Sequence, residues 1–494
     1  MSDHPARSLV PPDGWLGPVA AERAPVSPGF VWAATALALL VRLAGLTSQS
    51  LWVDEIMTWR AVRPDAGLSF LAQIRDAIQG PLYLAVVWPL VRLGPPELML
   101  RLPAALAGAA VVPVVAAVAA RLLDRPAARL AVLLVAINPF LVWYSQEARG
   151  YAFLVLFGAL MVLAFLRLRE AGPNVGDGVL FALASAATVW SNLSGLFLWA
   201  ALGLAVLLER PRAGRAWLGW GWAFLGGFAA ALPWLLQAAG IWAVDRIVPG
   251  AGTGEALRGD TTFTPSALPY TFFTFFFGFT LGPSLQELHE PGRMAAVRQA
   301  AGWLAAGLVP AALGFAWGLG HLGRRERQRW SLAVLVAVPA VILLLLAVRN
   351  VKPWNPRYLA AVVPWVLMIT SWGLLRLPRR AGPVLAFLLV AVTMASLVNL
   401  RFSSRYARED IRGAAAWASA QADAHRPALV PVITGVWRFY DPAGGPVIDA
   451  FGTPPLRSPA DADAYLASRL EGVDRLWYVA ARTWDFDPHG LLVP

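Results

Sequence analysis

The sequence predicts an all-α polytopic membrane protein that carries a small C-terminal α/β domain. Of its 494 residues, 58% are hydrophobic and only 14% are charged, and the mean hydropathy is +0.57. The apolar residues gather in repeated runs of roughly 18–24, the length of a helix that crosses a bilayer. These runs stop near residue 400, and the remainder of the chain is mixed in polarity.

The net charge and the cysteine content exclude some classes of function and make others less favourable. The net charge is +11, but the arginines cluster in short loops between apolar runs, so membrane topology explains them better than nucleic-acid binding does. Cysteine is absent, which excludes disulfides, thiolate metal sites and thiol nucleophiles. We expect the polar segment 1–29 to be cytoplasmic and the run 30–46 to act as an uncleaved signal anchor.

Basic residues mark five short loops, at 121–129, 167–169, 210–215, 324–329 and 376–380. If all five are cytoplasmic, the apolar runs between them must cross the membrane in pairs. This places the amino terminus inside and the carboxyl terminus outside. It predicts eleven crossings, at 30–46, 99–120, 130–144, 150–166, 178–194, 195–209, 216–239, 299–320, 331–348, 358–375 and 383–400.

Three further segments are expected in the outer loops. The segment 80–93 is too short to cross and contains two prolines, which favours a re-entrant or surface-lying helix. The phenylalanine-rich run 270–279 is also too short to span. Apolar residues at helical spacing before Gly80 predict an amphipathic helix; they are Leu68, Leu71, Ile74 and Ile78.

The C-terminal segment 401–494 lacks long apolar runs. Its pattern is helical at 409–422 and strand-like at 428–434 and 475–480. We therefore expect a small extracytoplasmic α/β domain there, after a membrane domain at 30–400.

A carboxylate pair, Asp54-Glu55, directly follows the first long apolar run. Carboxylates at the mouth of a membrane helix are costly to place, which makes them candidates for function. The predicted topology brings further charged residues to the same face, namely Arg101, Glu147, Arg149, Lys352 and Arg357.

This set of side chains suits one kind of reaction. Arginine binds phosphate through planar, bidentate hydrogen bonds, and a carboxylate can accept the proton of an attacking hydroxyl. A phosphate leaving group and a hydroxyl nucleophile describe glycosyl transfer from a lipid phosphate. Because nucleotide sugars are scarce outside the cytoplasm, a membrane-carried donor is the natural choice.

Several short motifs resemble those of the GT-C glycosyltransferases, closest to the bacterial relatives of family 39, the protein O-mannosyltransferase and aminoarabinose-transferase type. Each motif is weak alone, but their order and spacing agree over residues 30–405. They are Leu51-Trp52-Val53-Asp54-Glu55, Gly80-Pro81-Leu82-Tyr83, Leu100-Arg101-Leu102-Pro103, Asn138-Pro139-Phe140 with Tyr144-Ser145-Gln146-Glu147-Ala148-Arg149, and Pro356-Arg357-Tyr358.

The resemblance implies an inverting transfer of one sugar from a polyprenyl phosphate to a hydroxyl of a glycan, lipid or protein acceptor. Asp54 is then the general base or a carboxylate that orients the acceptor, and Glu55 supports it or binds sugar hydroxyls. Arg149 and Arg357 hold the donor phosphate or an anionic acceptor, and Arg101 lies nearby. The remaining substrate-binding residues implied are Tyr144, Gln146, Glu147, Lys352 and Tyr358.

Two positions depart from the family pattern. Relatives often have Lys or His directly before the proline of the re-entrant helix, where this chain has Gln79-Gly80-Pro81. Many also have a His-Tyr pair in a middle crossing, where this chain has Asn192-Leu193. Both differences concern contacts to phosphate and acceptor, not the reaction class.

No clear metal site or nucleotide loop appears. His289 with Glu287 and Glu290 could ligate a divalent ion, but a solvated loop explains them as well, and no ligand set requires a metal. The glycine-rich segment 250–254 has neither a preceding strand nor a following Lys-Ser/Thr, so it is interpreted as a linker.

Two other functions remain as alternatives. A transporter or flippase of lipid-linked sugars would place ionisable residues near mid-bilayer and broken helices in symmetric positions, whereas these charges lie at helix ends. A scaffold that binds lipid-linked sugars without turnover would make Asp54 dispensable. The composition, rich in Ala, Gly, Pro and Arg, suggests a bacterial plasma-membrane protein.

Overall fold

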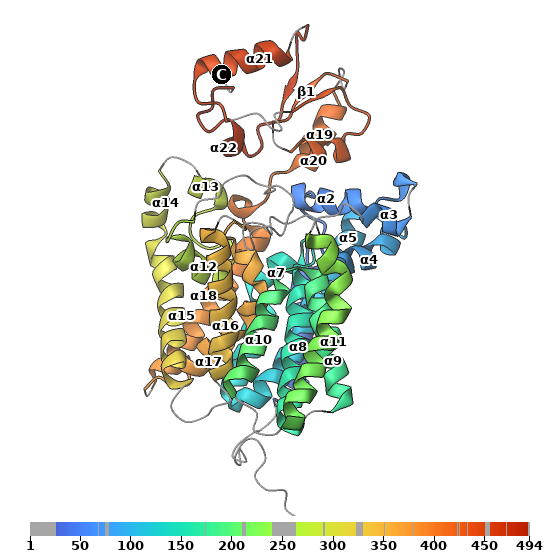
Figure 1. Ribbon diagram of the computed structural model, residues 1–494. Helices are drawn as coiled ribbons and strands as arrows, with labels where there is room; N and C mark the ends of the chain where they lie inside the picture. The colour runs from blue at the N-terminus through green and yellow to red at the C-terminus, as the bar shows by residue number, and fades with distance from the viewer. Residues whose placement is uncertain are drawn as a thin grey trace, which may run out of the picture.

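The computed structural model describes residues 26–492, apart from 68, 75–78, 173, 210–213, 240–262, 290–291, 323–329, 350, 379, 422, 424, 432, 450–454 and 471. Long helices run side by side in one bundle, and the C-terminal region lies over one end of it (Figure 1). The glycine-rich segment 250–254, the basic loop 324–329, Glu290 and most of the amino-terminal segment lie outside the described residues.

A helix occupies each of the eleven ranges predicted to cross the membrane. These elements are α1 (Pro28–Leu43), α5 (Pro96–Leu122), α6 (Arg125–Ile137) with α7 (Pro139–Ser145), α8 (Tyr151–Ala171), α9 (Val175–Ser191), α10 (Gly195–Glu209), α11 (Gly214–Ala239), α15 (Ala301–Leu322), α16 (Trp330–Val348), the 3₁₀ helix η3 (Pro356–Val362) with α17 (Val363–Leu374), and α18 (Ala381–Phe402).

Helix length separates these elements into two groups. Among the described residues, seven helices are long and apolar enough to cross a membrane, or eight if α6 and α7 form one bent span. The others, α1, α9 and α10, have 16, 17 and 15 residues. At 1.5 Å per residue they fall short of a hydrocarbon core about 30 Å thick, so eleven crossings stays a prediction.

The bend between α6 and α7 arises at Asn138-Pro139. Proline is favoured in the first turn of a helix, and Pro139 begins α7. The Asn138 side chain caps α7 by accepting a hydrogen bond from the Leu141 amide at 2.9 Å. The same side chain donates to the Phe275 carbonyl oxygen at 2.8 Å. The two helices therefore meet at 44°, and the bend is tied to α12 (Ala267–Phe277).

Ion pairs gather several predicted cytoplasmic loops at one end of the bundle. They link the ends of α5 and α8, of α8 and α9, of α8 and α10, and of α6 and α17. The pairs are Arg121–Glu170 at 3.4 Å, Arg167–Asp177 at 2.7 Å, Arg169–Glu209 at 2.8 Å and Arg376–Asp124 at 2.8 Å. This basic end lies away from the C-terminal region (Figure 1).

Close helix packing in the bundle depends on small residues. Helices α15 and α17 approach at Gly314 and Gly373, where a Cβ atom added to Gly373 would lie 1.9 Å from the Gly314 carbonyl oxygen. Small residues allow backbones to pack at this separation in a membrane, where lipid offers no hydrophobic driving force for helix association.

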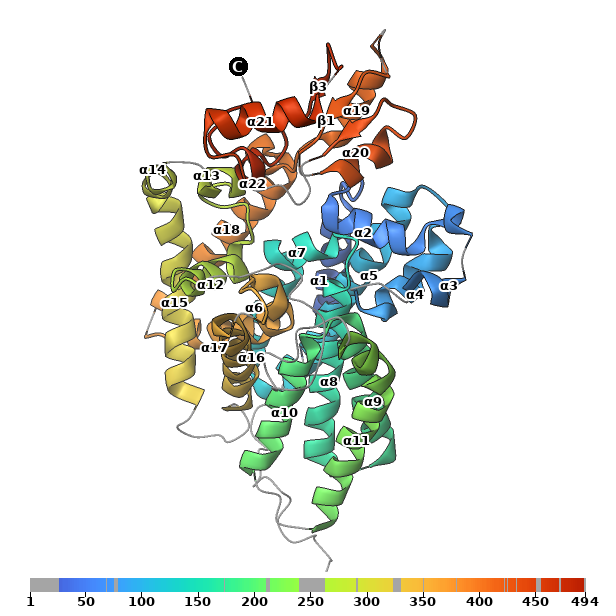
Figure 2. The same cartoon turned by 45° about the horizontal axis from the view of Figure 1, so that its top comes forward.

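Short helices cover the end of the bundle that faces the C-terminal region. Four of these short helices lie on one side, next to the C-terminal region (Figure 2). They are α2 (Val53–Val62), η1 (Pro64–Ala66), α3 (Phe70–Ile74) and α4 (Pro81–Leu90). On the other side lie α12, α13 (Leu285–His289) and α14 (Arg293–Gln299). Helices α4 and α12 have 10 and 11 residues, too short to span, as predicted.

The C-terminal region contains a three-stranded parallel sheet in the order β2-β1-β3. In this sheet Ala428 of β1 pairs with Val447 of β2 and with Trp477 of β3. The sequence pattern predicted β1 and β3 as longer strands and did not predict β2. The elements are η4 (Ser404–Tyr406), α19 (Ile411–Ser419), β1 (Ala428–Leu429), α20 (Thr434–Tyr440), β2 (Val447–Ile448), α21 (Pro459–Arg469), β3 (Trp477–Tyr478) and α22 (Thr483–Phe486).

Candidate active site

Asp54 and Arg357 form a buried ion pair at the end of the bundle near the C-terminal region. Asp54 lies in the first turn of α2, and its Oδ2 atom is 2.7 Å from Nη1 of Arg357 in η3. Their side chains are each 9% exposed. Arg149, in the turn before α8, donates to the backbone carbonyl of Asp54 at 3.3 Å. Three segments far apart in sequence therefore meet at Asp54.

Aromatic rings surround Arg357. Its guanidinium lies 5.4 Å from the ring centre of Tyr358 and 5.9 Å from that of Tyr151. The Lys352 ammonium lies 4.5 Å from the ring centre of Tyr358. The predicted residues Lys352, Arg357 and Tyr358 therefore form one cationic and aromatic cluster.

Glu55, the neighbour of Asp54, has a different environment. Arg101 donates to both of its carboxylate oxygens, at 2.7 and 2.6 Å. The backbone amides of Ala148 and Trp52 also donate to Glu55, at 2.9 and 3.2 Å. Burial raises the pKa of Glu55. The charge and hydrogen bonds of Arg101, the charge of Arg408 and the hydrogen bond from the Ala148 amide together outweigh burial and hold that pKa below its usual value. Glu55 is thus a fixed, ionised anchor for the start of α2.

Arg101 completes this anchor from α5. Besides Glu55, its guanidinium donates to the carbonyl oxygens of Leu46, Gln49 and Ser50 at 2.8–2.9 Å. All of its donors thus bind the segment that leads into α2. Arg101 therefore positions Asp54 indirectly, through Glu55 and the backbone of the segment that precedes α2.

Glu147 is a third carboxylate at this site, and it is fully buried. Neither of its oxygens makes a hydrogen bond to a residue that the structure describes, and Nη2 of Arg408 lies 3.7 Å away. Burial raises the pKa of Glu147 to about 7, the charges of Asp54 and Glu55 add to this effect, and Arg408 and Arg357 oppose it.

Two of the predicted pocket residues make structural contacts. The Gln146 amide donates to the Arg42 and Ala44 carbonyls, at 2.9 and 3.0 Å, and so satisfies the end of α1. Tyr144 is 5% exposed and packs edge-on against rings on three segments; these are Phe140, Tyr151 and Phe279.

Arg408 was not predicted from the sequence. It lies after α18, yet its guanidinium reaches Glu55 at 3.4 Å and Glu147 at 3.7 Å. It lies over the rings of Trp52 and Trp143, at 5.3 and 4.5 Å. Its position beyond the last crossing suggested a separate domain, and its sequence context gave no other signal.

The C-terminal region is docked on the loop that precedes α2 and on the start of α5. Arg412 pairs with Glu97 at 2.7 Å, and Tyr440 donates to the same carboxylate. The Leu51 amide donates to the Tyr440 hydroxyl oxygen at 2.7 Å. These contacts place Arg408 between the two buried glutamates.

The site as a whole carries more positive than negative charge. Its cations are Arg101, Arg149, Lys352, Arg357 and Arg408, and its carboxylates are Asp54, Glu55 and Glu147, so five charges against three leave +2 when every carboxylate is ionised. A net positive, partly buried site favours a multivalent anion such as phosphate. Among the described residues no group of three or more His, Asp or Glu is placed to hold a metal ion.

Comparison with known proteins identifies the fold. Residues 79–238 match the family described as dolichyl-phosphate-mannose-protein mannosyltransferase, and no curated protein matches the chain. ArnT from Cupriavidus metallidurans in the apo state superposes with a TM-score of 0.56 and 13% identity over 85% of each chain. The same protein bound to undecaprenyl phosphate superposes with a TM-score of 0.53 and 13% identity over 91% of this chain and 90% of that one.

The chain has the GT-C fold. The arabinofuranosyltransferase AftD from Mycobacteria also shares it, with a TM-score of 0.50 and 18% identity over 83% of this chain but only 30% of AftD. The GT-C resemblance expected from the motifs is therefore confirmed.

Gln79 and Asn192, at the two positions that depart from the GT-C sequence pattern, each make a hydrogen bond to a nearby residue. Gln79 accepts a hydrogen bond from the Thr58 hydroxyl at 2.8 Å, one turn after Asp54 on α2. The Ala148 carbonyl oxygen lies at the same distance, 2.8 Å, from the Thr58 hydroxyl, so the two acceptors share its one proton. Asn192 accepts from the Ser194 amide at 3.0 Å and so shapes the turn after α9. Of the two, Gln79 is the one joined to the helix that carries Asp54.

Proposed function

We propose that this protein is an inverting glycosyltransferase that moves a sugar from a polyprenyl-phosphate donor to an acceptor hydroxyl. The observation that carries the proposal is the buried Asp54–Arg357 pair, with 2.7 Å between its charged atoms. It combines a proton acceptor with a phosphate-binding group at one point. The structure of ArnT with undecaprenyl phosphate supports a donor of this class.

In the proposed reaction Asp54 acts as the general base. The acceptor oxygen forms a bond to the anomeric carbon while the bond from that carbon to the phosphate oxygen breaks. The proton of the acceptor hydroxyl passes to the Asp54 carboxylate, and the bonding electron pair leaves with the lipid phosphate. Attack opposite the leaving group inverts the anomeric configuration.

Arg357 stabilises the departing phosphate and also controls Asp54. Its Nε atom is buried and makes no hydrogen bond to any described residue, so a phosphate oxygen would supply the missing acceptor. A phosphate that binds Arg357 competes with Asp54 for the same guanidinium. Donor binding would therefore weaken the Asp54–Arg357 pair and make the carboxylate a better base. Arg149 and Lys352 add positive charge for the leaving group.

The other charged residues hold this geometry. Glu55 and Arg101 fix the start of α2, and Arg408 keeps a cation between Glu55 and Glu147. Tyr144, Gln146 and Tyr358 form walls around the site. No metal is assigned a role.

We also propose the orientation and the domain division. The basic helix ends are placed in the cytoplasm, and the site and carboxyl terminus outside the plasma membrane of a bacterium. Residues 30–400 form the catalytic membrane domain and 401–494 an α/β domain whose first residues, through Arg408, complete the site.

The test is sugar transfer by purified protein in proteoliposomes. Radiolabelled polyprenyl-phosphate sugars would be supplied with a membrane extract as acceptor, and the anomeric configuration of the product determined by NMR. Label in the acceptor with inverted configuration is expected. No transfer across the donor panel, together with movement of labelled lipid between leaflets, would overturn the proposal in favour of a flippase.

A further inference from the structure

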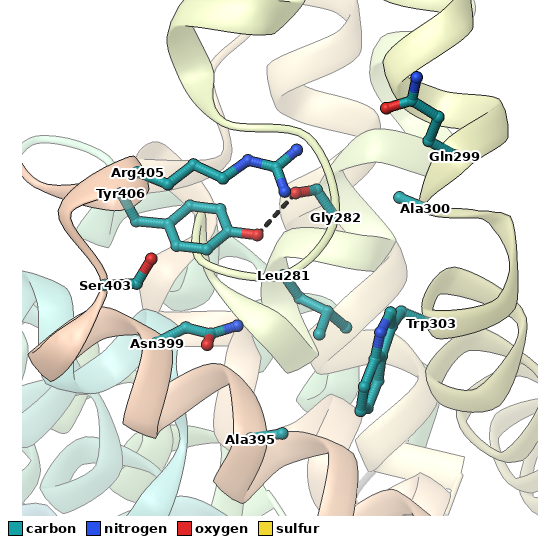
Figure 3. Close-up of a pocket in the computed structure, with 10 residues that line it drawn as sticks. All are labelled: Leu281, Gly282, Gln299, Ala300, Trp303, Ala395, Asn399, Ser403, Arg405 and Tyr406. Carbon is teal, nitrogen blue, oxygen red and sulfur yellow. Dashed lines mark hydrogen bonds between the residues drawn. The ribbon is translucent and has the colours of Figure 1, made fainter.

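A cavity of about 440 Å³ is lined by ten residues, none of which belongs to the Asp54 site. Figure 3 shows these residues. Four segments build it: the turn at Leu281-Gly282, the junction of α14 and α15, the last turns of α18, and the linker at 403–406. The proposed mechanism uses none of the ten residues that line it.

The walls of this cavity are tied together. The Tyr406 hydroxyl donates to the Gly282 carbonyl at 2.6 Å, as Figure 3 shows. Asn399 donates to the Thr280 carbonyl at 3.0 Å. Gly282 has φ +77°, a conformation that other residues rarely adopt. The linker and α18 therefore hold the 280–282 turn in one place, and the cavity is preformed.

The lining groups combine one large aromatic surface with neutral polar groups. The Trp303 side chain is 58% exposed and stands beside Leu281 at one side of the cavity (Figure 3). Amides from Gln299 and Asn399 and the hydroxyl of Ser403 supply hydrogen-bond donors and acceptors. A flat apolar ring beside amides and a hydroxyl matches a sugar, which has apolar C–H faces and a rim of hydroxyl groups.

The charges of the residues around the cavity favour a neutral ligand. Of the lining residues in the described part of the chain, Arg405 alone carries a formal charge, and Glu287 neutralises it at 2.8 Å. Glu287 accepts one hydrogen bond from Arg405 and one from the Ser284 amide, and both lower its pKa. The Arg405–Glu287 pair therefore stays ionised at neutral pH. A lipid phosphate or sulfated sugar would have to displace Glu287, whereas a neutral sugar would not.

We propose that this cavity binds a neutral sugar unit of the acceptor. The identification of that sugar as acceptor rests on the proposed glycosyltransferase function. The linker at 403–406 connects the cavity to the Asp54 site. Ser403, Arg405 and Tyr406 line the cavity. Arg408, two residues after Tyr406, lies between Glu55 and Glu147 of the Asp54 site. The acceptor is therefore a glycan with one unit held at Trp303 and another presented to Asp54.

Direct binding tests this proposal without turnover. Full-length protein in nanodiscs would be applied to an array of neutral, phosphorylated and sulfated oligosaccharides, and affinities for neutral hits measured by calorimetry. Trp303→Ala should weaken binding about tenfold because the stacking surface is lost, and Trp303→Phe should retain most of it. Trp222→Ala is the matched control, since Trp222 is also exposed, at 69%, but lies on α11.

Each outcome decides the proposal. Binding of neutral oligosaccharides that Trp303→Ala weakens and Trp222→Ala leaves intact supports it. No binding of neutral oligosaccharides, equal loss in both variants, or selective binding of the anionic sugars overturns it. If the protein binds neutral oligosaccharides but transfers no sugar, the proposed function fails and the carbohydrate site stands.

Discussion

Asp54 and Glu55 show how two adjacent carboxylates acquire different properties from their surroundings. Glu55 accepts from Arg101, Ala148 and Trp52 and is fully buried. Asp54 faces Arg357, which retains an unused donor at Nε among the described residues. Saturated hydrogen bonding makes Glu55 an anchor. The ion pair of Asp54 with Arg357, for which a phosphate can compete, suits Asp54 to proton transfer.

Glu147 should make stability depend on pH. Its pKa is raised from 4.5 to about 7 in the folded protein, so the folded state binds more protons than the unfolded state between these values, and stability falls as pH rises through this range. Glu147→Gln removes the effect. The free energy of unfolding of the variant minus that of wild type should therefore be roughly 3 kcal/mol larger at pH 8 than at pH 4.5. Thermal unfolding of both proteins at the two pH values measures this difference. A variant-minus-wild-type difference that is the same at both would contradict the raised pKa.

At the scale of elements, apolar runs located every helix of the bundle, because the length and hydropathy of a run are local properties of the sequence. Whether α1, α9 and α10 cross is not local, since helices of 15–17 residues depend on bilayer thickness and neighbours. The two-residue strand β2 was not predicted, because its pairing with β1 comes from tertiary packing rather than from its own pattern.

The candidate site was predictable only in part. Topology alone could place Asp54, Arg101 and Arg357 at one end of the bundle. It could not show that Arg101 pairs with Glu55 and Arg357 with Asp54, because these partners are separated by 46 and 303 residues. Arg408 could not be found, since its role depends on how the C-terminal region docks.

The Arg101–Glu55 pair should contribute strongly to the anchoring of α2. Arg101→Met leaves the Glu55 carboxylate buried with a weakened set of partners and should lower stability by about 3–5 kcal/mol. Arg63→Met is the matched control, because Arg63 pairs with Asp65 at the surface, where the two side chains are 47% and 68% exposed. Its loss should cost about 1 kcal/mol or less. Equal losses of thermal stability in detergent would refute the anchoring role.

The molecule as a whole has two chemically distinct ends. Arginine–carboxylate pairs join helix ends at one, and the carboxylate–arginine site with the docked C-terminal region occupies the other (Figure 1). Separation of the basic loops from the site is the arrangement that the positive-inside rule predicts for the proposed extracytoplasmic active site.

The orientation can be tested by labelling, and the absence of cysteine gives a clean background. Ser419→Cys, at the exposed end of α19, should react with a membrane-impermeant maleimide in intact spheroplasts. Arg125→Cys, exposed at the start of α6, should react only after permeabilisation. The reverse pattern would place the site in the cytoplasm.

The central claim is that Asp54 accepts the acceptor proton during sugar transfer. The most direct measurement is the single-turnover rate of transfer from a labelled polyprenyl-phosphate sugar by wild type, Asp54→Asn and Asp65→Asn, with Asp65 being a surface carboxylate 68% exposed on the same segment. Because Asn keeps the shape of Asp but cannot accept the proton, Asp54→Asn should slow transfer about 100-fold or more, and Asp65→Asn should match wild type. Transfer by Asp54→Asn at the wild-type rate would contradict the assignment.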